Sequence, residues 1–325
     1  MPENENMKAV EQRAMLGDAL VALGKDYPNL VVLCPDVSRS TGAIRFREAF
    51  PDRFFSTGVS EQNTIGMASG LSREGWIPLV TGFAMFVVGK PWEPLRNSIA
   101  YPGNNVKIIG THSGINVGPD GVTAQAIEDI ALTRAIPGMT VLVPTDGNQV
   151  LPVLRAAIRR DGPVYIRLER AAILLITQPE APFEIGQSLT LREGNDATVI
   201  AVGGMAAQAL NAAEYLEQDG ISARVISMVS VKPLDEAAVI RAARETGAIV
   251  TAEDHNCYGG LGSAVAEVLA RNALGPLETV ALRDTFGQSG EASELYDYYQ
   301  LSARHIADAV RRALARREAQ RKDRP

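Results

Sequence analysis

The segment GVSEQNTIGMASGL at 58–71 holds one carboxylate, Glu61, among small and apolar residues. A short strand ending near Thr57 would lead into Gly58, and Ser60 would then cap the helix that follows. Burial favours the protonated form of a carboxylate and a helix N-terminus favours its charged form, so a glutamate here can share a proton with a bound heterocycle. The alternative is a first-turn glutamate on a solvated helix face.

Other short motifs follow this segment in a definite order. In the first half of the chain they are TGFAMF at 81–86, THSGINVGPDG at 111–121 and AIEDIALTRAIPGMTVLVPTD at 126–146. In the second half they are ATVIAVGGMAAQAL at 197–210, VISMVSVKPLD at 225–235 and IVTAEDHNCYGGLGSAV at 249–265. The first set resembles the pyrimidine-binding domain of transketolases, and the second resembles their C-terminal domain. Several motifs in family order are more specific than any single one.

The resemblance implies that thiamine diphosphate is the cofactor and that its pyrimidine ring binds to this chain. Glu61 would bond a ring nitrogen and so help the cofactor's own amino group to act as a base. Phe83 and Phe86 match aromatic residues that pack against the ring, and Asp36 matches an aspartate near the cofactor. Without the neighbouring motifs, the two phenylalanines would be core residues and Asp36 a turn aspartate. Gly89 replaces a third aromatic residue that is common in the family.

The resemblance also implies a site for an anionic sugar. Arg13, Ser40, His112 and Arg170 stand where the family binds a sugar phosphate, and Asp120 matches an aspartate that binds a substrate hydroxyl. Arginine offers forked donors suited to phosphate oxygens. Taken singly, the arginines fit surface charges, and Ser40 and Asp120 fit ordinary turn residues. His112 has the best individual claim, because it ends a buried strand at the expected cleft.

Two departures from the family pattern bear on the donor sugar. Ala124 stands where transketolases commonly have a His or Gln that contacts the donor's first hydroxyl. The segment GKPWEPLR at 89–96 departs from the usual RAxDQIR pattern. The identity of the donor, including whether its anion is phosphate or sulfonate, therefore stays open.

The diphosphate and its Mg²⁺ are expected on another chain. The family holds them with a GDG segment on an N-terminal domain, and this sequence contains no GDG. The resemblance thus implies a C-terminal subunit that has no metal site of its own and is active only with a GDG-bearing N-terminal partner, in an α2β2 heterotetramer.

The function implied is transfer of a two-carbon ketol unit from a ketose phosphate to an aldose phosphate, with Glu61 and His112 as catalytic residues. Three alternatives remain. The chain fits a beta-type subunit that passes a two-carbon unit to a carrier protein, a 2-oxoacid dehydrogenase component, or a scaffold without catalysis. EDHN at 253–256 and GGLG at 259–262 are expected to be structural or interfacial, His255 included.

The elements that must position these residues follow from hydrophobic patterning. Short apolar runs alternate with helical stretches, which predicts an α/β fold with two parallel-sheet domains. The domains are expected at 7–175 and 191–318, joined by a proline-containing linker at 176–190. Strands are expected at 30–36, 76–82, 105–112, 139–146, 162–169, 197–203, 223–230 and 247–254. Helices are expected at 11–25, 60–74, 126–136, 147–160, 205–218, 235–246 and 261–273.

Composition is that of a globular enzyme subunit. The 325 residues are 46% hydrophobic and 22% charged, with a net charge of −6, which argues against nucleic-acid and anionic membrane surfaces. The start, MPENENMKAV, lacks the apolar core of a signal peptide, and no apolar run is long enough to span a bilayer. Cys34 and Cys257 lie far apart and are flanked by strand-like or loop sequence, so neither a disulfide framework nor a metal cluster is indicated. We therefore expect a cytoplasmic protein with reduced cysteines.

Overall fold

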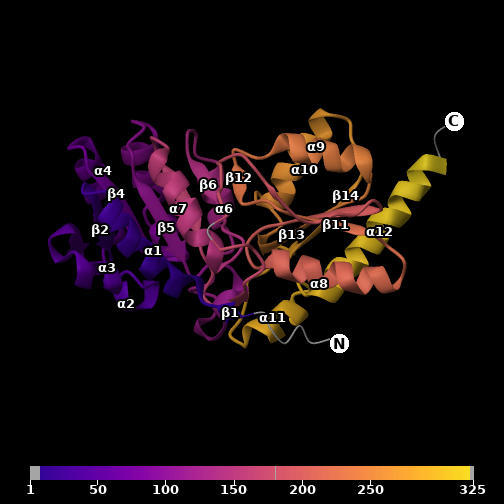
Figure 1. Ribbon diagram of the computed structural model, residues 1–325, viewed down its shortest axis with the longest axis horizontal. Helices are drawn as coiled ribbons and strands as arrows, with labels where there is room; N and C mark the ends of the chain where they lie inside the picture. The colour runs from indigo at the N-terminus through magenta and orange to yellow at the C-terminus, as the bar shows by residue number, and fades with distance from the viewer. Residues whose placement is uncertain (1–7, 180, 323–325) are drawn as a thin grey trace.

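Two β-sheets covered by helices organise residues 8–179 and 181–322, the part of the chain that the computed structural model describes (Figure 1). The first sheet has the strand order β12-β6-β7-β5-β4-β2-β3. Its strands are β2 (Leu30–Cys34), β3 (Phe54–Ser56), β4 (Ile77–Phe83), β5 (Lys107–Thr111), β6 (Thr140–Leu142), β7 (Val164–Arg167) and β12 (Ser230–Lys232). All of its strand pairs are parallel except that of β12 with β6.

Helices bury both faces of this sheet. Leu30 and Val32 of β2 pack in one apolar cluster with α1, α3 and α7, whereas Val31 and Leu33 face a second cluster that contains residues of α4 and α6. This alternation follows from the two-residue period of a strand. The helices and helical turns of this region are α1 (Gln12–Asp26), α2 (Ser38–Thr41), α3 (Ile44–Ala49), η1 (Pro51–Arg53), α4 (Glu61–Arg73), η2 (Met85–Gly89), α5 (Trp92–Pro94), η3 (Leu95–Ala100), η4 (Ile115–Asp120), α6 (Asp129–Arg134), η5 (Gly147–Gln149) and α7 (Val150–Arg159).

The second sheet has the order β14-β13-β10-β11-β9, with β9 antiparallel at one edge. It consists of β9 (Leu189–Arg192), β10 (Ala197–Ala201), β11 (Ala223–Ser227), β13 (Ile249–Asn256) and β14 (Leu277–Leu282). Helices α8 and α12 pack in the cluster on one face, and α9 and α10 pack on the other. The helices are α8 (Met205–Gln218), α9 (Glu236–Glu245), α10 (Leu261–Arg271), α11 (Ala292–Tyr298) and α12 (Ala303–Lys322).

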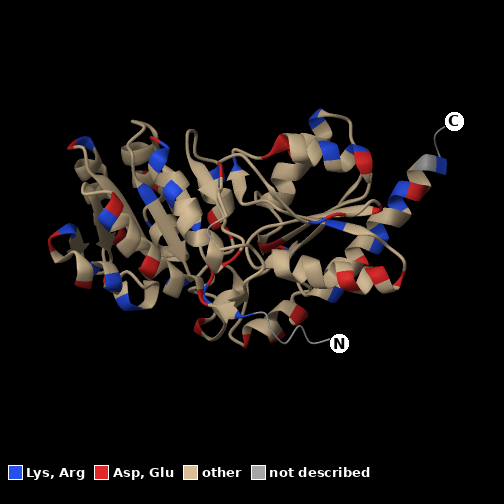
Figure 2. Cartoon of the chain, viewed as in Figure 1, with Lys and Arg blue, Asp and Glu red and all other residues tan. Residues whose placement is uncertain are grey.

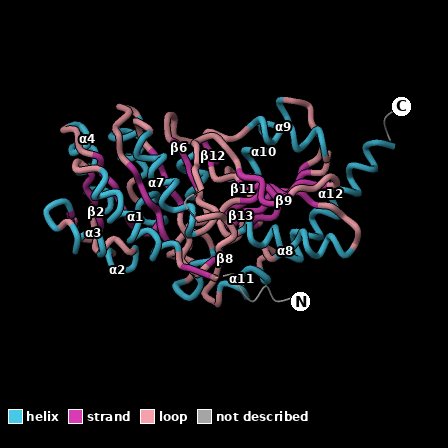
Figure 3. Tube along the Cα trace, viewed as in Figure 1, coloured by secondary structure: helices cyan, strands magenta, loops and turns pink. Residues whose placement is uncertain are grey.

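The α/β class with two largely parallel sheets is confirmed, but one strand lies in a sheet that its place in the sequence does not predict. Residues 230–232, expected in the second domain, form β12 and pair with β6 of the first sheet, as Figure 3 also shows. The expected linker, 176–190, already includes the start of β9 at Leu189. The short strands β1 (Ala9–Val10) and β8 (Ile173–Leu174) pair separately as an antiparallel ribbon. The expected domain limits stay predictions, and residue 7 lies outside the described part.

The two sheets also share one apolar core. A single cluster contains Val80 and Ile108 of the first sheet together with Ile200 and Ile226 of the second. Within residues 8–179 and 181–322, no helix is long and apolar enough to cross a membrane. In the same ranges, no group of three or more His, Cys, Asp or Glu residues is placed to hold a metal ion.

Buried polar groups lie where the two domains meet. The Arg167 guanidinium, at the end of β7, pairs with Asp129 at 2.9 Å and donates to the main-chain oxygen of Asp254 at 2.7 Å. Glu169 is 2% exposed, and its Oε1 accepts from the amide of Gly204 at 2.6 Å. Burial, together with repulsion from the nearby Asp254 carboxylate, raises the pKa of Glu169 to about 7.

This shift predicts a pH-dependent stability that Glu169→Gln should remove. The unfolded chain releases this proton near pH 4.5 and the folded chain near pH 7, so the folded state holds more protons between these values. Raising the pH through that window should lower the free energy of unfolding of the wild type relative to Glu169→Gln by up to about 3 kcal/mol. Denaturant unfolding at pH 5 and pH 8 measures this difference. The exposed Glu48→Gln is the control, and an equal pH response in wild type and Glu169→Gln would contradict the assignment.

Candidate active site

The candidate residues lie along one edge of the first sheet. Strands β3, β2, β4, β5 and β7 are neighbours in that order and parallel, so their carboxyl ends share this edge. In the same order come Glu61 after β3, Asp36 after β2, Phe83 at the end of β4, His112 after β5 and Arg170 after β7. The carboxyl edge of such a sheet is where ligands of α/β proteins bind. The fold therefore brings together residues that are far apart in sequence.

Glu61 opens helix α4, and its side chain is 8% exposed. The expected strand before it is present as β3, and Ser60 stands at the N-cap position. Ser60 does not cap the helix with its side chain, because its hydroxyl turns back and donates to the Thr57 carbonyl at 2.7 Å. The Ser60 carbonyl instead accepts from the Thr64 amide at 2.9 Å. The prediction of a side-chain cap was therefore wrong, although the position of Glu61 in the first turn is as expected.

Lys90 is the ionic partner of Glu61. Its ammonium lies 3.1 Å from Glu61 Oε2 and 4.9 Å from the centre of the Phe86 ring. Among the described residues, no hydrogen bond engages the second oxygen of Glu61, so Oε1 is available to a ligand. The sequence analysis did not single out Lys90. The signal that pointed to it was the departure from the family pattern at 89–96, within which it lies.

Three aromatic rings lie in a row that begins at Phe86, next to Lys90. The Phe83 and Phe86 rings are 6.2 Å apart at a 34° angle, and Phe83 lies 3.9 Å from the His112 ring at 30°. Both phenylalanines are half-buried, so each keeps one part of its ring exposed at the edge of the sheet. An apolar surface of this kind next to a buried carboxylate suits a flat heterocycle that carries a ring nitrogen.

His112 is buried, and its backbone is in the left-handed region, at φ 57°. Burial, together with the positive charges of Arg13 and Arg170, lowers its pKa to about 4. Thr111 Oγ1 donates its only proton to the Gly82 carbonyl at 3.2 Å, so it accepts from His112 Nδ1 at 2.9 Å. The imidazole is therefore neutral near pH 7, and its Nε2 is a hydrogen-bond acceptor.

The charged residues near His112 form a small group. Arg13, in the first turn of α1, makes a two-pronged ion pair with Glu11 at 2.9 Å for each contact. Arg170 donates to the Val117 carbonyl at 2.8 Å and lies 3.7 Å from Asp120. Glu11 was not predicted from the sequence, because nothing in its surroundings marks it as a partner of Arg13. Each arginine is about 30% exposed in its side chain, at 28% and 29%, so both can reach a ligand.

The remaining candidates lie at the same edge with less contact to the others. Asp36 is exposed just beyond β2 and has φ 59°, and Ser40 is half-buried in the short helix α2. Ala124 is 8% exposed, so this position adds a buried methyl group rather than a polar one. The structure thus places Phe86 near Lys90 and its partner Glu61. It places His112 next to Phe83 and near the charged group of Arg13, Arg170 and Asp120.

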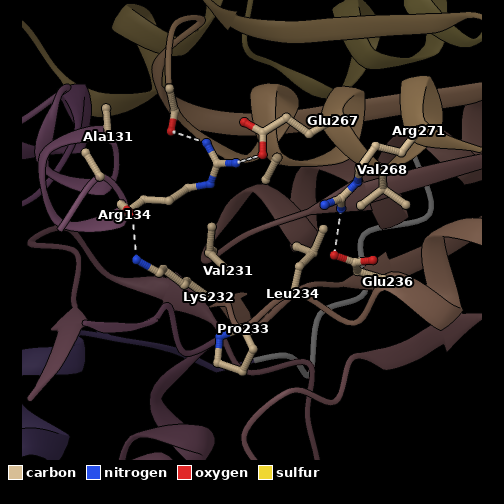
Figure 4. Close-up of a pocket in the computed structure, with 13 residues that line it drawn as sticks. Ala131, Arg134, Val231, Lys232, Pro233, Leu234, Glu236, Glu267, Val268 and Arg271 are labelled. Carbon is tan, nitrogen blue, oxygen red and sulfur yellow. Dashed lines mark hydrogen bonds and ion pairs between the residues drawn. The ribbon is translucent and has the colours of Figure 1, made fainter. Parts of the chain in front are cut away.

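A groove at the domain boundary is separate from this site. It has a volume of about 590 Å³ and is lined by α6, α9, α10, strand β12 and the segment after it (Figure 4). Its basic side chains are already engaged: Arg134 with Glu267, Arg271 with Glu236, and Lys232 with main-chain oxygens. None of the residues predicted to act in catalysis or binding lines it.

Comparison with known proteins supports the sequence motifs. The model of the transketolase pyrimidine-binding domain matches residues 8–174, and that of the transketolase C-terminal domain matches residues 186–306. A putative transketolase C-terminal section from Methanocaldococcus jannaschii is 47% identical over 297 residues, which cover 90% of this chain and 93% of that protein. The 6-deoxy-6-sulfo-D-fructose transketolase subunit SqwH from Clostridium sp. is 40% identical over 300 residues, covering 92% and 93%.

A solved structure is similar over the same length. It is a split gene transketolase in an inactive beta4 tetramer, with a TM-score of 0.87 and 44% identity over 95% of this chain and 100% of that one. Two domain models in the expected order and relatives of this similarity establish that the chain belongs to the transketolase family, a family of thiamine-diphosphate-dependent transferases.

Proposed function

We propose that this chain is the C-terminal subunit of a two-chain transketolase that moves a two-carbon ketol unit from a ketose phosphate to an aldose phosphate. The observation that carries the proposal is the row of residues along one sheet edge, with a buried carboxylate and aromatic wall at one end and two arginines beside a neutral histidine at the other. The first end suits a cofactor heterocycle, and the second suits an anionic sugar.

The residues present fit thiamine diphosphate. When bound, the cofactor supplies a nucleophilic carbon that allows bonds next to a carbonyl to be cleaved and formed. Glu61 would hold a proton at a pyrimidine ring nitrogen through its free oxygen, Phe83 and Phe86 would keep the ring flat and exclude water, and Asp36 would border the ring. Lys90 would keep Glu61 in place through the ion pair at 3.1 Å.

At the substrate end, some residues would attract the anion of the sugar by their charge, and others would bind its hydroxyls by hydrogen bonds. Charged residues are interspersed over both domains (Figure 2), so an anion must be attracted locally, by Arg13 and Arg170. His112 Nε2 would accept a proton or hydrogen bond from a substrate hydroxyl, and Asp120 would bind a second hydroxyl. Ser40 would add a short donor. One relative is named for a sulfonated sugar, and a sulfonate would fit the same arginines as a phosphate.

The rest of the enzyme would come from a partner. We propose that an N-terminal subunit with a GDG motif holds the diphosphate and Mg²⁺, and that the two chains form an α2β2 heterotetramer. We also propose a cytoplasmic location, where free cysteines such as Cys34 and Cys257 stay reduced.

The function is tested by measuring transfer from xylulose 5-phosphate to ribose 5-phosphate with thiamine diphosphate and Mg²⁺. We expect no turnover by this chain alone and turnover when the GDG-bearing chain is added. A parallel assay with 6-deoxy-6-sulfofructose as donor distinguishes a sulfonate from a phosphate substrate. If the mixture binds cofactor and transfers nothing to any aldose phosphate, the sugar-phosphate proposal is wrong and carrier-protein thiols are the next acceptors to test.

Replacing Glu61 should remove catalysis while leaving the fold intact. Glu61→Gln keeps the side chain's size but removes its charge and its ability to share a proton with the pyrimidine nitrogen. We expect transfer by the reconstituted enzyme to fall by about 10²–10⁴-fold. Glu74→Gln, an exposed glutamate just beyond the other end of helix α4, is the matched control. A Glu61→Gln enzyme with the rate of the wild type would rule out this role.

His112 should be neutral over the working pH range. Its pKa of about 4 predicts that ¹⁵N NMR of labelled histidine will show a neutral ring with the proton on Nδ1 from about pH 5.5 to pH 8. The signal is assigned by its loss in His112→Gln. A midpoint near the ordinary value of 6.5, or a proton on Nε2, would contradict the assignment of His112 as a neutral acceptor with its proton on Nδ1.

A further inference from the structure

Strand β13 carries three consecutive buried polar residues, Glu253, Asp254 and His255, that each engage a different element. Glu253 accepts from two amides at the start of α10, at 2.7 and 2.8 Å. His255 Nε2 accepts from an amide of α6 at 3.3 Å. Asp254 alone points at the active-site loop. The sequence analysis treated this motif as structural as a whole, whereas the structure separates its members.

Asp254 holds the loop that follows His112. Its Oδ1 accepts from the Ile115 amide at 2.8 Å, and its Oδ2 accepts from the Asn116 amide at 3.1 Å and the Tyr296 hydroxyl at 3.2 Å. The loop approaches so closely that a Cβ on Gly114 would collide with the carboxylate, and Gly114 has φ 70°. A residue of the second domain therefore sets the position of a first-domain loop.

The same loop holds the residues proposed to bind the sugar. It begins at His112, and the Arg170 side chain donates to its Val117 carbonyl at 2.8 Å. The Asn116 side chain accepts from the Ala171 amide at 2.6 Å, which ties the loop to the segment that carries Arg170. Displacing the loop would move the imidazole and the guanidinium together.

Asp254 is itself fixed from the first domain. Arg167 donates to its main-chain oxygen at 2.7 Å and pairs with Asp129 of α6. The main-chain oxygen and both side-chain oxygens of Asp254 thus accept hydrogen bonds, and the residue is only 1% exposed. A charged acceptor held in this way is a stronger anchor for two amides than a neutral one.

We propose that Asp254 is a positioning residue for the sugar-phosphate site, acting on the substrate through the loop 112–120. The proposal rests on the proposed transketolase function. Asp254 touches neither cofactor nor sugar. It keeps His112 and Arg170 at the spacing that the anionic sugar requires, so the second domain contributes to substrate affinity without contributing a contact.

The test compares Asp254→Asn with Glu253→Gln in the reconstituted enzyme. Each change turns a buried carboxylate that accepts from two amides into the corresponding amide, on adjacent residues of one strand. In both variants the new NH₂ group faces a backbone amide, which is also a donor.

For Asp254→Asn we expect KM for the aldose phosphate to rise about tenfold, the effect of one lost buried hydrogen bond to a charged group. Affinity for thiamine diphosphate should change less than KM, because Glu61, Phe83 and Phe86 lie outside the loop and only His112 of the three rings lies in it. Glu253→Gln should leave KM unchanged.

Hydrogen exchange gives a readout that does not depend on the proposed function. The amides of Ile115 and Asn116 should exchange faster in Asp254→Asn than in wild type or Glu253→Gln. Unchanged exchange at these two amides would overturn the proposal, as would an equal rise in KM for both variants. If wild type transfers no ketol unit but exchange at the loop changes as expected, the loop anchor stands and the proposed function fails.

A second variant covers the case in which Asp254→Asn does not fold. Gly114→Ala pushes the same loop away from the carboxylate and leaves Asp254 and β13 intact. It should raise KM for the aldose phosphate in the same direction. A folded Gly114→Ala enzyme with the KM of the wild type would show that the loop position does not govern sugar binding.

Discussion

A single buried arginine connects the parts of this molecule on which the site depends. Arg167 leaves the end of β7, pairs with Asp129 of α6 and bonds the main-chain oxygen of Asp254 on β13. Removing one partner of such a pair leaves a charge unpaired away from water, at a cost of about 3–5 kcal/mol. This cost keeps the guanidinium in place against α6 of the first domain, and its bond to the Asp254 main-chain oxygen then ties the second domain to it.

The relative position of the two domains affects the active site through a short series of hydrogen bonds. The domain position places Asp254 against the loop after His112, and the loop in turn holds Arg170. Two further features hold the domains together. They are the apolar core shared by the two sheets and strand β12, which joins the first sheet. The second domain therefore belongs to the functional unit even though none of the residues proposed to meet cofactor or sugar lies on it.

The site separates two kinds of chemistry along one sheet edge. At one end, a carboxylate with a lysine partner sits against aromatic rings, an environment for proton sharing with a heterocycle. At the other end, burial and two arginines keep His112 neutral. The arginines therefore carry the positive charge for the anion, and His112 is the proton acceptor. Ala124 contributes a buried methyl group rather than a polar one.

The sequence alone predicted most of the fold and named most of the residues proposed for the site. Buried strands and amphipathic helices are local patterns, and parallel strands must end at one edge, so the α/β class and the gathering of Glu61, Phe83 and His112 there were predictable. Tertiary structure decided what depends on contacts between distant residues. The Glu61–Lys90 pair spans 29 positions and the Asp254–Ile115 bond 139, and residues 230–232 pair outside their own domain. No local periodicity encodes such contacts, because they arise only when the sheets pack and bury charges that must then find partners.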